Sequence, residues 1–452
     1  MLEKIFHLKE KNTTVLTEMI AGLTIFMAMS YIFLINPILL SKTGMPYQSV
    51  FTATILASII GTLFMGVIAN VPYAQSAGMG LNAIFTYTLC QGLGFSWQQA
   101  LAIVFLSGLI NTIITMCHIR EKLIKAIPNF LQDAIVVGIG LFISYIGIKN
   151  ANFLQFGVEN VIEGTAMSEH VVPSIAAFSH PSIMLAAIGL IITVILVIKK
   201  VKGAYLWGIV ITTLIGIPMG VTLLPDFSSY SFVPSIKDTF LQLDLDGLWT
   251  AQAGIPIVIM TIFSTCIATI FDSIGTLIGT GRKTGIFDIQ QGKELPPNLR
   301  KAMYADSIAT MAGGLLGTSN ITVFAESSSG IEAGGKTGLT AVFVAVFMVF
   351  SLLLAPIISM IPMAAVAPIL IVVGMNMITA VTKIDWRDMV IAIPAFLTMV
   401  LMPLSYSITT GIEVGFFFYI ITKWTTGKAR EVSPILYVFT FLFILDFIYK
   451  AL

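Results

Sequence analysis

Apolar residues along the chain gather into fourteen long segments separated by polar connections. Many of these segments have about 20 residues, the length that an α-helix needs to cross a lipid bilayer. They fall near residues 17–40, 49–70, 73–91, 99–117, 128–148, 182–198, 203–224, 253–280, 302–316, 318–333, 338–359, 361–381, 388–404 and 408–424. The pattern predicts an all-α polytopic membrane protein with fourteen transmembrane segments. A further apolar run, 433–449, fits either an additional span or a helix in the membrane interface.

Composition agrees with this pattern and excludes several classes of function. Of the 452 residues, 57% are apolar and only 10% are charged, whereas soluble domains carry about 25% charged residues. The formal net charge of +1 excludes a nucleic-acid partner that binds a basic face. The three cysteines, Cys90, Cys117 and Cys266, lie in apolar segments, which argues against a disulfide framework or a metal site. We therefore expect no metal and no cofactor other than a coupling ion.

Charged residues in the connections predict the orientation. Basic clusters precede the first segment and follow the fourth, sixth, eighth and fourteenth segments, so all lie on one side. The connections near 150–181 and 225–250 are acidic, with Lys237 as their one basic residue. Under the positive-inside rule, the N-terminus faces the cytoplasm of a cell membrane.

The two halves of the chain resemble each other weakly. Residues 127–140 (IPNFLQDAIVVGIG) are similar to 361–375 (IPMAAVAPILIVVGM), and 71–78 (VPYAQSAG) to 323–330 (VFAESSSG). Seven segments per half invert the second copy relative to the first, which is typical of secondary transporters. We expect one repeat in residues 1–230 and the other in 231–452, the second including the C-terminal hydrophobic helix.

The third and tenth segments are unusual for membrane spans. Each begins with a short β-prone stretch, 70–73 or 321–324, and then breaks into small residues, QSAGMG or ESSSG. Irregular backbone at membrane depth is tolerated where it is buried in protein or lines a cavity. We expect short β-strands in these segments, with Ser76 and Ser327 capping the helices that follow. Paired breaks in two halves indicate a binding site between them.

Two acidic residues inside the predicted spans are the main candidates for chemistry. Asp272 lies within TIFDSIGTLIGT, and Glu326 lies at the break of the tenth segment. Carboxylates within a membrane are costly and usually functional, and low dielectric favours their protonated form. Each is expected to accept an N–H group from a neutral ligand or to hold a coupling proton. A role in helix packing is the alternative for both.

Amides and aromatic rings near the two breaks extend the predicted site. Asn82 and Gln75 offer both a donor and an acceptor, as recognition of a heterocycle edge requires. Phe85, Tyr87 and Phe324 are candidates for stacking on a planar ring, although aromatic residues in spans more often serve packing. Four further acids near span ends or small residues are weaker candidates, with structural or gating roles at least as plausible: Asp133, Asp306, Glu332 and Glu413.

The stretch GIEAGGKT, residues 330–337, matches the phosphate-binding pattern G-x-x-x-x-G-K-[ST]. That function needs a strand that enters the loop directly and a helix that leaves it. Here AESSS separates the β-prone stretch from Gly330, and the chain has no polar stretch long enough for a nucleotide-binding domain. We therefore interpret Lys336 as part of a turn between two spans.

Three stretches carry a resemblance to a known family. AGMGLNAIFTYT (77–88), FDSIGTLIGTG (271–281) and TVFAESSSGIEAGGKTGLTA (322–341) resemble the azaguanine-type hypoxanthine/guanine permeases. This branch belongs to the nucleobase–ascorbate transporter superfamily, together with the bacterial uracil permease. Lys336 stands where many relatives carry arginine, and the branch also contains adenine permeases with similar motifs.

The resemblance implies a fold and a mechanism. It implies a core of segments 1–4 and 8–11 that moves against a gate of segments 5–7 and 12–14, proton symport of purine bases, and a homodimer. It places substrate contacts at Asn82, Asp272 and Glu326. The expected function is import of hypoxanthine or guanine, with both acids accepting purine N–H groups while Asn82 and the backbone near Ser327 serve its acceptors.

Other functions remain open from the sequence. An adenine permease of the same branch, or a pyrimidine or anion carrier of the same fold, would differ in substrate. A channel would neither saturate nor concentrate its substrate. An intramembrane hydrolase using Asp272 and Glu326 is disfavoured, because the chain contains no GxGD-type aspartyl motif and no serine–histidine pair within the spans. We therefore expect a transporter that is not an enzyme.

Overall fold

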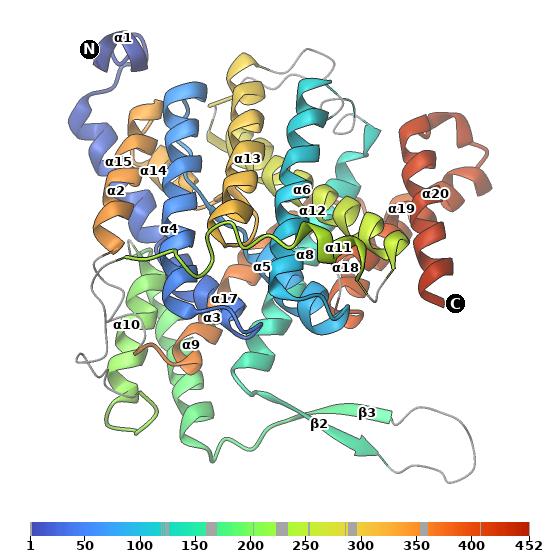
Figure 1. Cartoon of the computed structure of the whole chain (residues 1–452), viewed down its shortest axis with the longest axis horizontal. Coiled ribbons are helices and arrows are strands. Elements are labelled where there is room, and N and C mark those ends of the chain that lie inside the picture. Colours follow the sequence, from blue (N-terminus) through green and yellow to red (C-terminus); the bar gives the residue numbers. More distant parts are fainter. Residues whose placement is uncertain are drawn as a thin grey trace.

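The computed structural model is almost entirely helical (Figure 1). It describes residues 2–118, 120, 122, 126–159, 170–201, 203–222, 234–251, 254–284, 286–287, 296–352, 360–406 and 408–451. Seven helical stretches in this part of the chain are long and apolar enough to cross a membrane: Val15–Ser41, Tyr47–Ala69, Trp97–Met116, Asn129–Asn150, Pro181–Ile198, Ile255–Ile274 and Met363–Lys383. Shorter apolar helices are Ala204–Gly216, Gly338–Ser351 and Met389–Leu404.

The elements of the first half follow the predicted segments closely. They are α1 (Leu2–Phe6), α2 (Val15–Met29), α3 (Ile32–Ser41), α4 (Tyr47–Phe64), the π-helical η1 (Met65–Ala69), β1 (Gln75–Ala77), α5 (Met79–Ala83), the π-helical η2 (Ile84–Gly92), α6 (Trp97–Met116), α8 (Asn129–Asn150), β2 (Leu154–Glu159), β3 (His170–Ile175), α9 (Pro181–Ile198) and α10 (Ala204–Gly216). One difference is that the first predicted segment contains two helices, α2 and α3, separated at Ser30 and Tyr31.

The second half has a similar order of elements. They are α11 (Leu245–Trp249), α12 (Ile255–Thr284), α13 (Pro297–Leu316), β4 (Ile321–Val323), α14 (Ser327–Glu332), α15 (Gly338–Ser351), α17 (Met363–Ile378), η5 (Thr379–Lys383), α18 (Met389–Leu404), α19 (Ile408–Thr425), η6 (Ala429–Glu431) and α20 (Pro434–Ala451). The undecided run 433–449 forms α20, which packs against α19 and α12.

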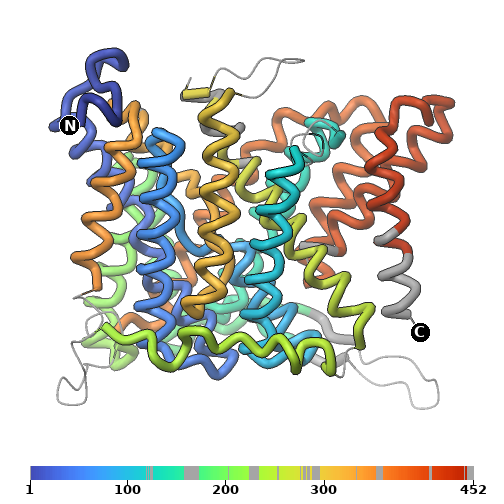
Figure 2. The backbone as a smooth tube through the Cα atoms, turned by 45° about the horizontal axis from the view of Figure 1, so that its top comes forward, coloured from blue at the N-terminus to red at the C-terminus, as the bar shows by residue number. Residues whose placement is uncertain are grey.

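The helices pack into two groups. The first group contains α2, α3, α4, α6, α12, α13, α14 and α15, and the second contains α8, α9, α10, α17, α18 and α19. Each group combines helices from both halves of the chain, so that α15 lies beside α2 and α17 beside α8 (Figures 1 and 2). Residues distant in the sequence therefore meet within each group.

A β-hairpin forms in the connection after α8. Strands β2 and β3 pair antiparallel, with Leu154 opposite Ile175 and Glu159 opposite His170. The hairpin projects from the end of the molecule opposite α1 (Figure 1). The sequence predicted only an acidic connection here, because nothing in its apolar pattern marked the strands. Parts of this connection, 160–169, and of the one near 225–250, up to residue 233, lie outside the described residues.

Candidate functional site

Strands β1 and β4 bring the two broken segments together. They pair antiparallel, with Gln75 opposite Val323 and Ala77 opposite Ile321. Backbone bonds extend the pairing at both ends, from Phe324 N to Ala74 O at 3.0 Å and from Gly78 N to Asn320 O at 3.1 Å. The second strand coincides with the predicted β-prone stretch 321–324, whereas the first begins two residues after 70–73.

Glu326 lies where the chain turns from β4 into α14. Its Oε1 accepts a hydrogen bond of 2.7 Å from the Tyr31 hydroxyl, and its side chain is partly exposed. Tyr31 stands at the break between α2 and α3, and its ring contacts Phe324 at 6.5 Å and Tyr205 of α10 at 5.6 Å between centroids. The sequence analysis missed Tyr31, because the break in the first segment carries no glycine or small-residue run.

Asp272 approaches the same strand pair from α12. Its carboxylate is hydrogen-bonded to the side chain of Thr322 in β4, and it is also partly exposed. A Cβ atom at Gly78 would lie 2.6 Å from Thr322 Oγ1 and 3.0 Å from Asp272 Oδ2. Only glycine lets the backbone after β1 approach Asp272 this closely.

Glu326 and Asp272 are alike in their charged surroundings. Within the described ranges, neither carboxylate forms an ion pair with a lysine, arginine or histidine. Asp272 accepts one hydrogen bond from a hydroxyl group, and Glu326 accepts one from a hydroxyl group and one from its own backbone N–H. The remaining lone pairs of both carboxylates are left for further donors. The arrangement can therefore accept N–H groups of a ligand on two sides.

Asn82 of α5 is fully buried beside this site. Its Oδ1 accepts a bond of 2.5 Å from the Ser319 hydroxyl, while its Nδ2 has no hydrogen-bond partner. Ser319 precedes β4 in a polar turn that the sequence analysis did not select, because Thr-Ser-Asn is common in ordinary loops.

The other predicted contacts lie in closed surroundings. Gln75 and Phe85 are buried, and Gln75 packs so tightly against α4 that a Cβ atom on Gly61 would collide with its Oε1. Phe324 is 4% exposed and contacts Tyr31. Tyr87 packs edge-on against Tyr406, with 5.4 Å between ring centroids.

The predicted capping roles of Ser76 and Ser327 are wrong. The Ser76 hydroxyl bonds instead to Ser58 of α4 at 2.7 Å, and α5 has no side-chain cap. The Ser327 hydroxyl accepts the Ala74 N–H at 3.0 Å, and the N-cap position of α14 is Glu326, without a side-chain cap bond. Strand pairing places each serine against another segment, so tertiary contacts take the hydroxyls that local geometry would have used.

Backbone N–H groups in and just after the GIEAGGKT stretch donate hydrogen bonds to the carboxylate of Glu18. Glu18 of α2 is fully buried and accepts backbone N–H groups of Lys336 at 3.0 Å, Thr337 at 3.2 Å and Thr340 at 3.2 Å, together with the Thr340 hydroxyl. The donors that resemble a phosphate cradle thus tie α15 to α2, in agreement with the turn predicted at Lys336.

The weaker acidic candidates have varied surroundings. Asp306 of α13 is buried and forms an ion pair of 2.8 Å with the buried Arg120. Asp133 lies 3.8 Å from Lys383, and Glu413 is buried in α19. The side chain of Glu332 lies outside the described residues. Among those that are described, no three His, Cys, Asp or Glu side chains could share a metal ion.

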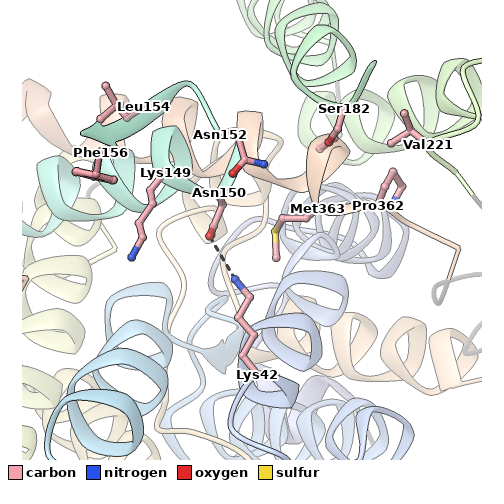
Figure 3. Close-up of a pocket in the computed structure, with 11 residues that line it drawn as sticks. Lys42, Lys149, Asn150, Asn152, Leu154, Phe156, Ser182, Val221, Pro362 and Met363 are labelled. Carbon is pink, nitrogen blue, oxygen red and sulfur yellow. Dashed lines mark hydrogen bonds between the residues drawn. The ribbon is translucent and has the colours of Figure 1, made fainter. Parts of the chain in front are cut away.

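A cavity of about 630 Å³ lies apart from these residues, at the end of α3 and α8 (Figure 3). Its polar lining includes Lys42, Lys149 and Asn150. The Lys42 ammonium donates to Asn150 Oδ1 at 3.3 Å, and Lys149 lies 4.7 Å from the centre of the Tyr406 ring. The cavity therefore joins helices of the two groups, and none of the predicted substrate contacts lines it.

The seven long apolar helices in the described part of the chain are those of a multi-pass membrane protein. A model of the permease family matches residues 16–414. The chain therefore belongs to this permease family, within the nucleobase–ascorbate transporters, and is not an enzyme. These findings confirm the resemblance and the expected class.

Several curated relatives match nearly the whole chain. A putative permease of Methanocaldococcus jannaschii is 40% identical, with 100% of this chain and 99% of the relative covered. The guanine/hypoxanthine permease PbuO of Bacillus subtilis is 38% identical, covering 98% and 99%. The adenine permease AdeP of Escherichia coli is 37% identical, covering 99% and 96%.

A solved structure supports the fold alone. The transmembrane domain of the cyanobacterial bicarbonate transporter BicA matches with a TM-score of 0.60 at 16% identity, covering 88% of this chain and 96% of that domain.

Proposed function

We propose that this protein imports purine nucleobases, with hypoxanthine or guanine as substrate, by proton symport. The observation that carries the proposal is the convergence of Asp272 and Glu326 on the paired strands, both partly exposed and without a basic partner among the described residues. A neutral purine presents N–H groups along its ring edge, and two carboxylates with free lone pairs are suitable acceptors for them.

The coupling ion in this proposal is a proton, held by Glu326 or Asp272. One proton that moves inward across 100 mV supplies about 2.3 kcal/mol. This free energy corresponds to roughly fiftyfold accumulation of the substrate. No metal or organic cofactor takes part.

The transport movement is an alternating-access shift between the two packing groups. In this proposal the first group is the core that carries the substrate, and the second group is the gate against which it moves. The N-terminus lies in the cytoplasm, because the basic connections lie on its side. The working unit is a homodimer in the cell membrane, as the family resemblance implies.

The direct test is uptake of labelled hypoxanthine into proteoliposomes under an imposed inward proton gradient, with guanine, adenine, xanthine and uracil as competitors. We expect accumulation that a protonophore abolishes and guanine inhibits. Inhibition by adenine alone would assign the protein to adenine, which the similarity to AdeP makes the second candidate. Failure to accumulate any base would refute the proposal.

A carboxylate variant tests the residue assignment separately. Glu326→Gln should lower uptake roughly tenfold to a hundredfold, because a hydrogen bond to a charged group contributes about 1.5–3 kcal/mol. The control is Asp133→Asn, which changes an acid of α8 outside the proposed site. Normal uptake and normal pH dependence in Glu326→Gln would refute this assignment.

A further inference from the structure

The cavity at the end of α3 and α8 lies where the two helix groups meet (Figure 3). Lys42, at the end of α3, lines it from the first group, whereas Lys149 of α8 and Met363 of α17 line it from the second group. The β2–β3 hairpin starts beside it, at the end of the molecule opposite α1 (Figure 1). The orientation proposed above places this end outside the cell.

Lys42 connects the two groups by hydrogen bonds. Its ammonium group donates to Asn150 Oδ1 of α8 at 3.3 Å and to the Tyr87 hydroxyl of η2 at 3.2 Å. Because η2 contacts α3, α5 and α6, it belongs to the first group, and Lys42 therefore bonds to both groups at once. Both acceptors are neutral, so these bonds are weaker than an ion pair and easier to exchange during a movement.

Aromatic rings form a second set of contacts between the groups. Tyr87 packs edge-on against Tyr406, which lies between α18 and α19, with 5.4 Å between the ring centroids. The Lys149 ammonium lies 5.9 Å from the centre of the Tyr87 ring and 4.7 Å from that of Tyr406. Neither tyrosine lines the cavity, but both contact the lysines that do. The two rings therefore lie behind the lysines, where one group meets the other.

One continuous stretch of chain leads from the proposed substrate site to these contacts. It begins at Gly78, which packs against Asp272, and continues through α5 into η2, which carries Tyr87. Asp272 and Glu326 do not line the cavity, although both are partly exposed. The site carboxylates thus face a space other than the cavity, and Tyr87 stands on the segment that connects the two places.

We propose that the cavity is the outer mouth of the substrate path, and that Lys42 and Tyr87 close it by their contacts with Asn150 and Tyr406. We call these four residues the outer closure. When the two groups shift, the Lys42–Asn150 bond and the Tyr87–Tyr406 contact break, and the cavity becomes continuous with the site. The inference rests on the proposed alternating access and adds the place where the path closes on one side.

The test links the two groups chemically across the outer closure. The three native cysteines are first replaced by serine, and Lys42→Cys/Asn150→Cys is treated with a short bifunctional methanethiosulfonate, whose links a reducing agent cleaves. Uptake of labelled hypoxanthine in proteoliposomes should fall roughly tenfold after linking, because joined groups cannot separate, and should return after reduction. The matched control is Ser182→Cys/Val221→Cys, which lines the same cavity from the second group alone and should keep its uptake after linking.

A second pair tests the inference even if Asn150→Cys does not fold. Lys42→Cys/Lys149→Cys replaces one exposed side chain from each group and should respond to linking and reduction in the same way. Mass spectrometry shows that each link has formed. Full uptake by a linked pair that joins the groups, or an equal loss in the linked control, would overturn this inference while nucleobase transport stands. Absence of uptake of every base by the wild-type protein would instead refute the proposed function.

Discussion

Two pairs of carboxylates within the first helix group differ in how their oxygen atoms are used. Glu18 and Asp306 are buried, and each meets several fixed donors from neighbouring helices. Asp306 accepts from Arg120 at 2.8 Å and from Ser273 at 2.5 Å. Asp272, the residue directly before Ser273, is partly exposed and is bonded to one hydroxyl.

The comparison shows that the partners and the exposure of an acid among these helices, rather than its residue type, indicate its role. A carboxylate whose lone pairs are filled by fixed donors holds helices together and has little capacity for a ligand. A carboxylate with exposure and free lone pairs can exchange partners during a transport cycle. Asp272 lies in α12 and Asp306 in the next helix, α13. Even so, Asp306 belongs with the carboxylates held by fixed donors and Asp272 with those that keep free lone pairs. The following variants test this division.

The largest expected effect comes from the buried ion pair. Arg120→Met leaves the Asp306 carboxylate buried without its cation and should lower the free energy of unfolding by about 3–5 kcal/mol. Thermal unfolding in detergent measures this loss. The double variant Arg120→Met/Asp306→Leu should recover much of the stability, because no charge then remains buried. A stable single variant would contradict the structural role.

A smaller loss of stability is expected at Glu18. Glu18→Ala leaves several N–H donors near the start of α15 without an acceptor and should cost about 2–3 kcal/mol of unfolding free energy. Glu18→Gln retains one acceptor oxygen and should cost less. Thermal unfolding gives the stability, and the concentration dependence of hypoxanthine uptake by the remaining folded protein should be unchanged. A changed KM with unchanged stability would place Glu18 among the carboxylates that contact the substrate.

Tyr31→Phe tests the carboxylates of the proposed substrate site. The variant removes the one hydroxyl bonded to Glu326 and should raise the KM for hypoxanthine roughly fivefold, corresponding to about 1 kcal/mol, with little change in melting temperature. The control is Tyr205→Phe, which removes the hydroxyl of an adjacent ring that bonds Asn376 instead. Equal effects of the two variants would show that the hydrogen bond from Tyr31 to Glu326 makes no specific contribution to substrate binding.

The smallest effect is expected for an exposed pair. Lys423 lies 2.6 Å from Glu431, and this hydrogen bond holds the pKa of Glu431 below its usual range. The pair therefore contributes above the pKa of an ordinary glutamate, about 4.3, and its contribution is lost as the pH falls. Because Glu431 is exposed, Glu431→Gln should not measurably change the melting temperature at pH 7. A large fall in melting temperature would show that this exposed ion pair stabilises the protein as the buried Arg120–Asp306 pair does.

Much of the helical pattern is already predictable from the sequence. The apolar segments near 99–117, 128–148 and 182–198 correspond to α6, α8 and α9 with small shifts at their ends. Composition and periodicity suffice there, because a helix that crosses a membrane must satisfy its own backbone and present apolar side chains. The motifs around Asn82, Asp272 and Glu326 likewise indicated the permease family, which the comparisons confirm.

The local roles of polar residues were less predictable. Ser76 and Ser327 have the position and chemistry of helix caps, yet both hydroxyls bond to other segments. Tyr31 and Ser319 have no local signal, because their partners Glu326 and Asn82 lie 295 and 237 residues away in the chain. A pattern within one segment contains no information about a donor that another segment supplies.

The sequence by itself determined that the chain is a multi-pass membrane protein with helical segments interrupted near residues 70–78 and 321–330, because segment length and small-residue breaks are local properties. The permease family followed from the resemblance of its motifs, which the family match confirms. Only the tertiary structure decided which of the acids have their lone pairs occupied by fixed donors and which retain free lone pairs. Glu18, Asp272, Asp306 and Glu326 are the same kind of group in the sequence, and they differ through the side chains and backbone donors that packing brings to each of them.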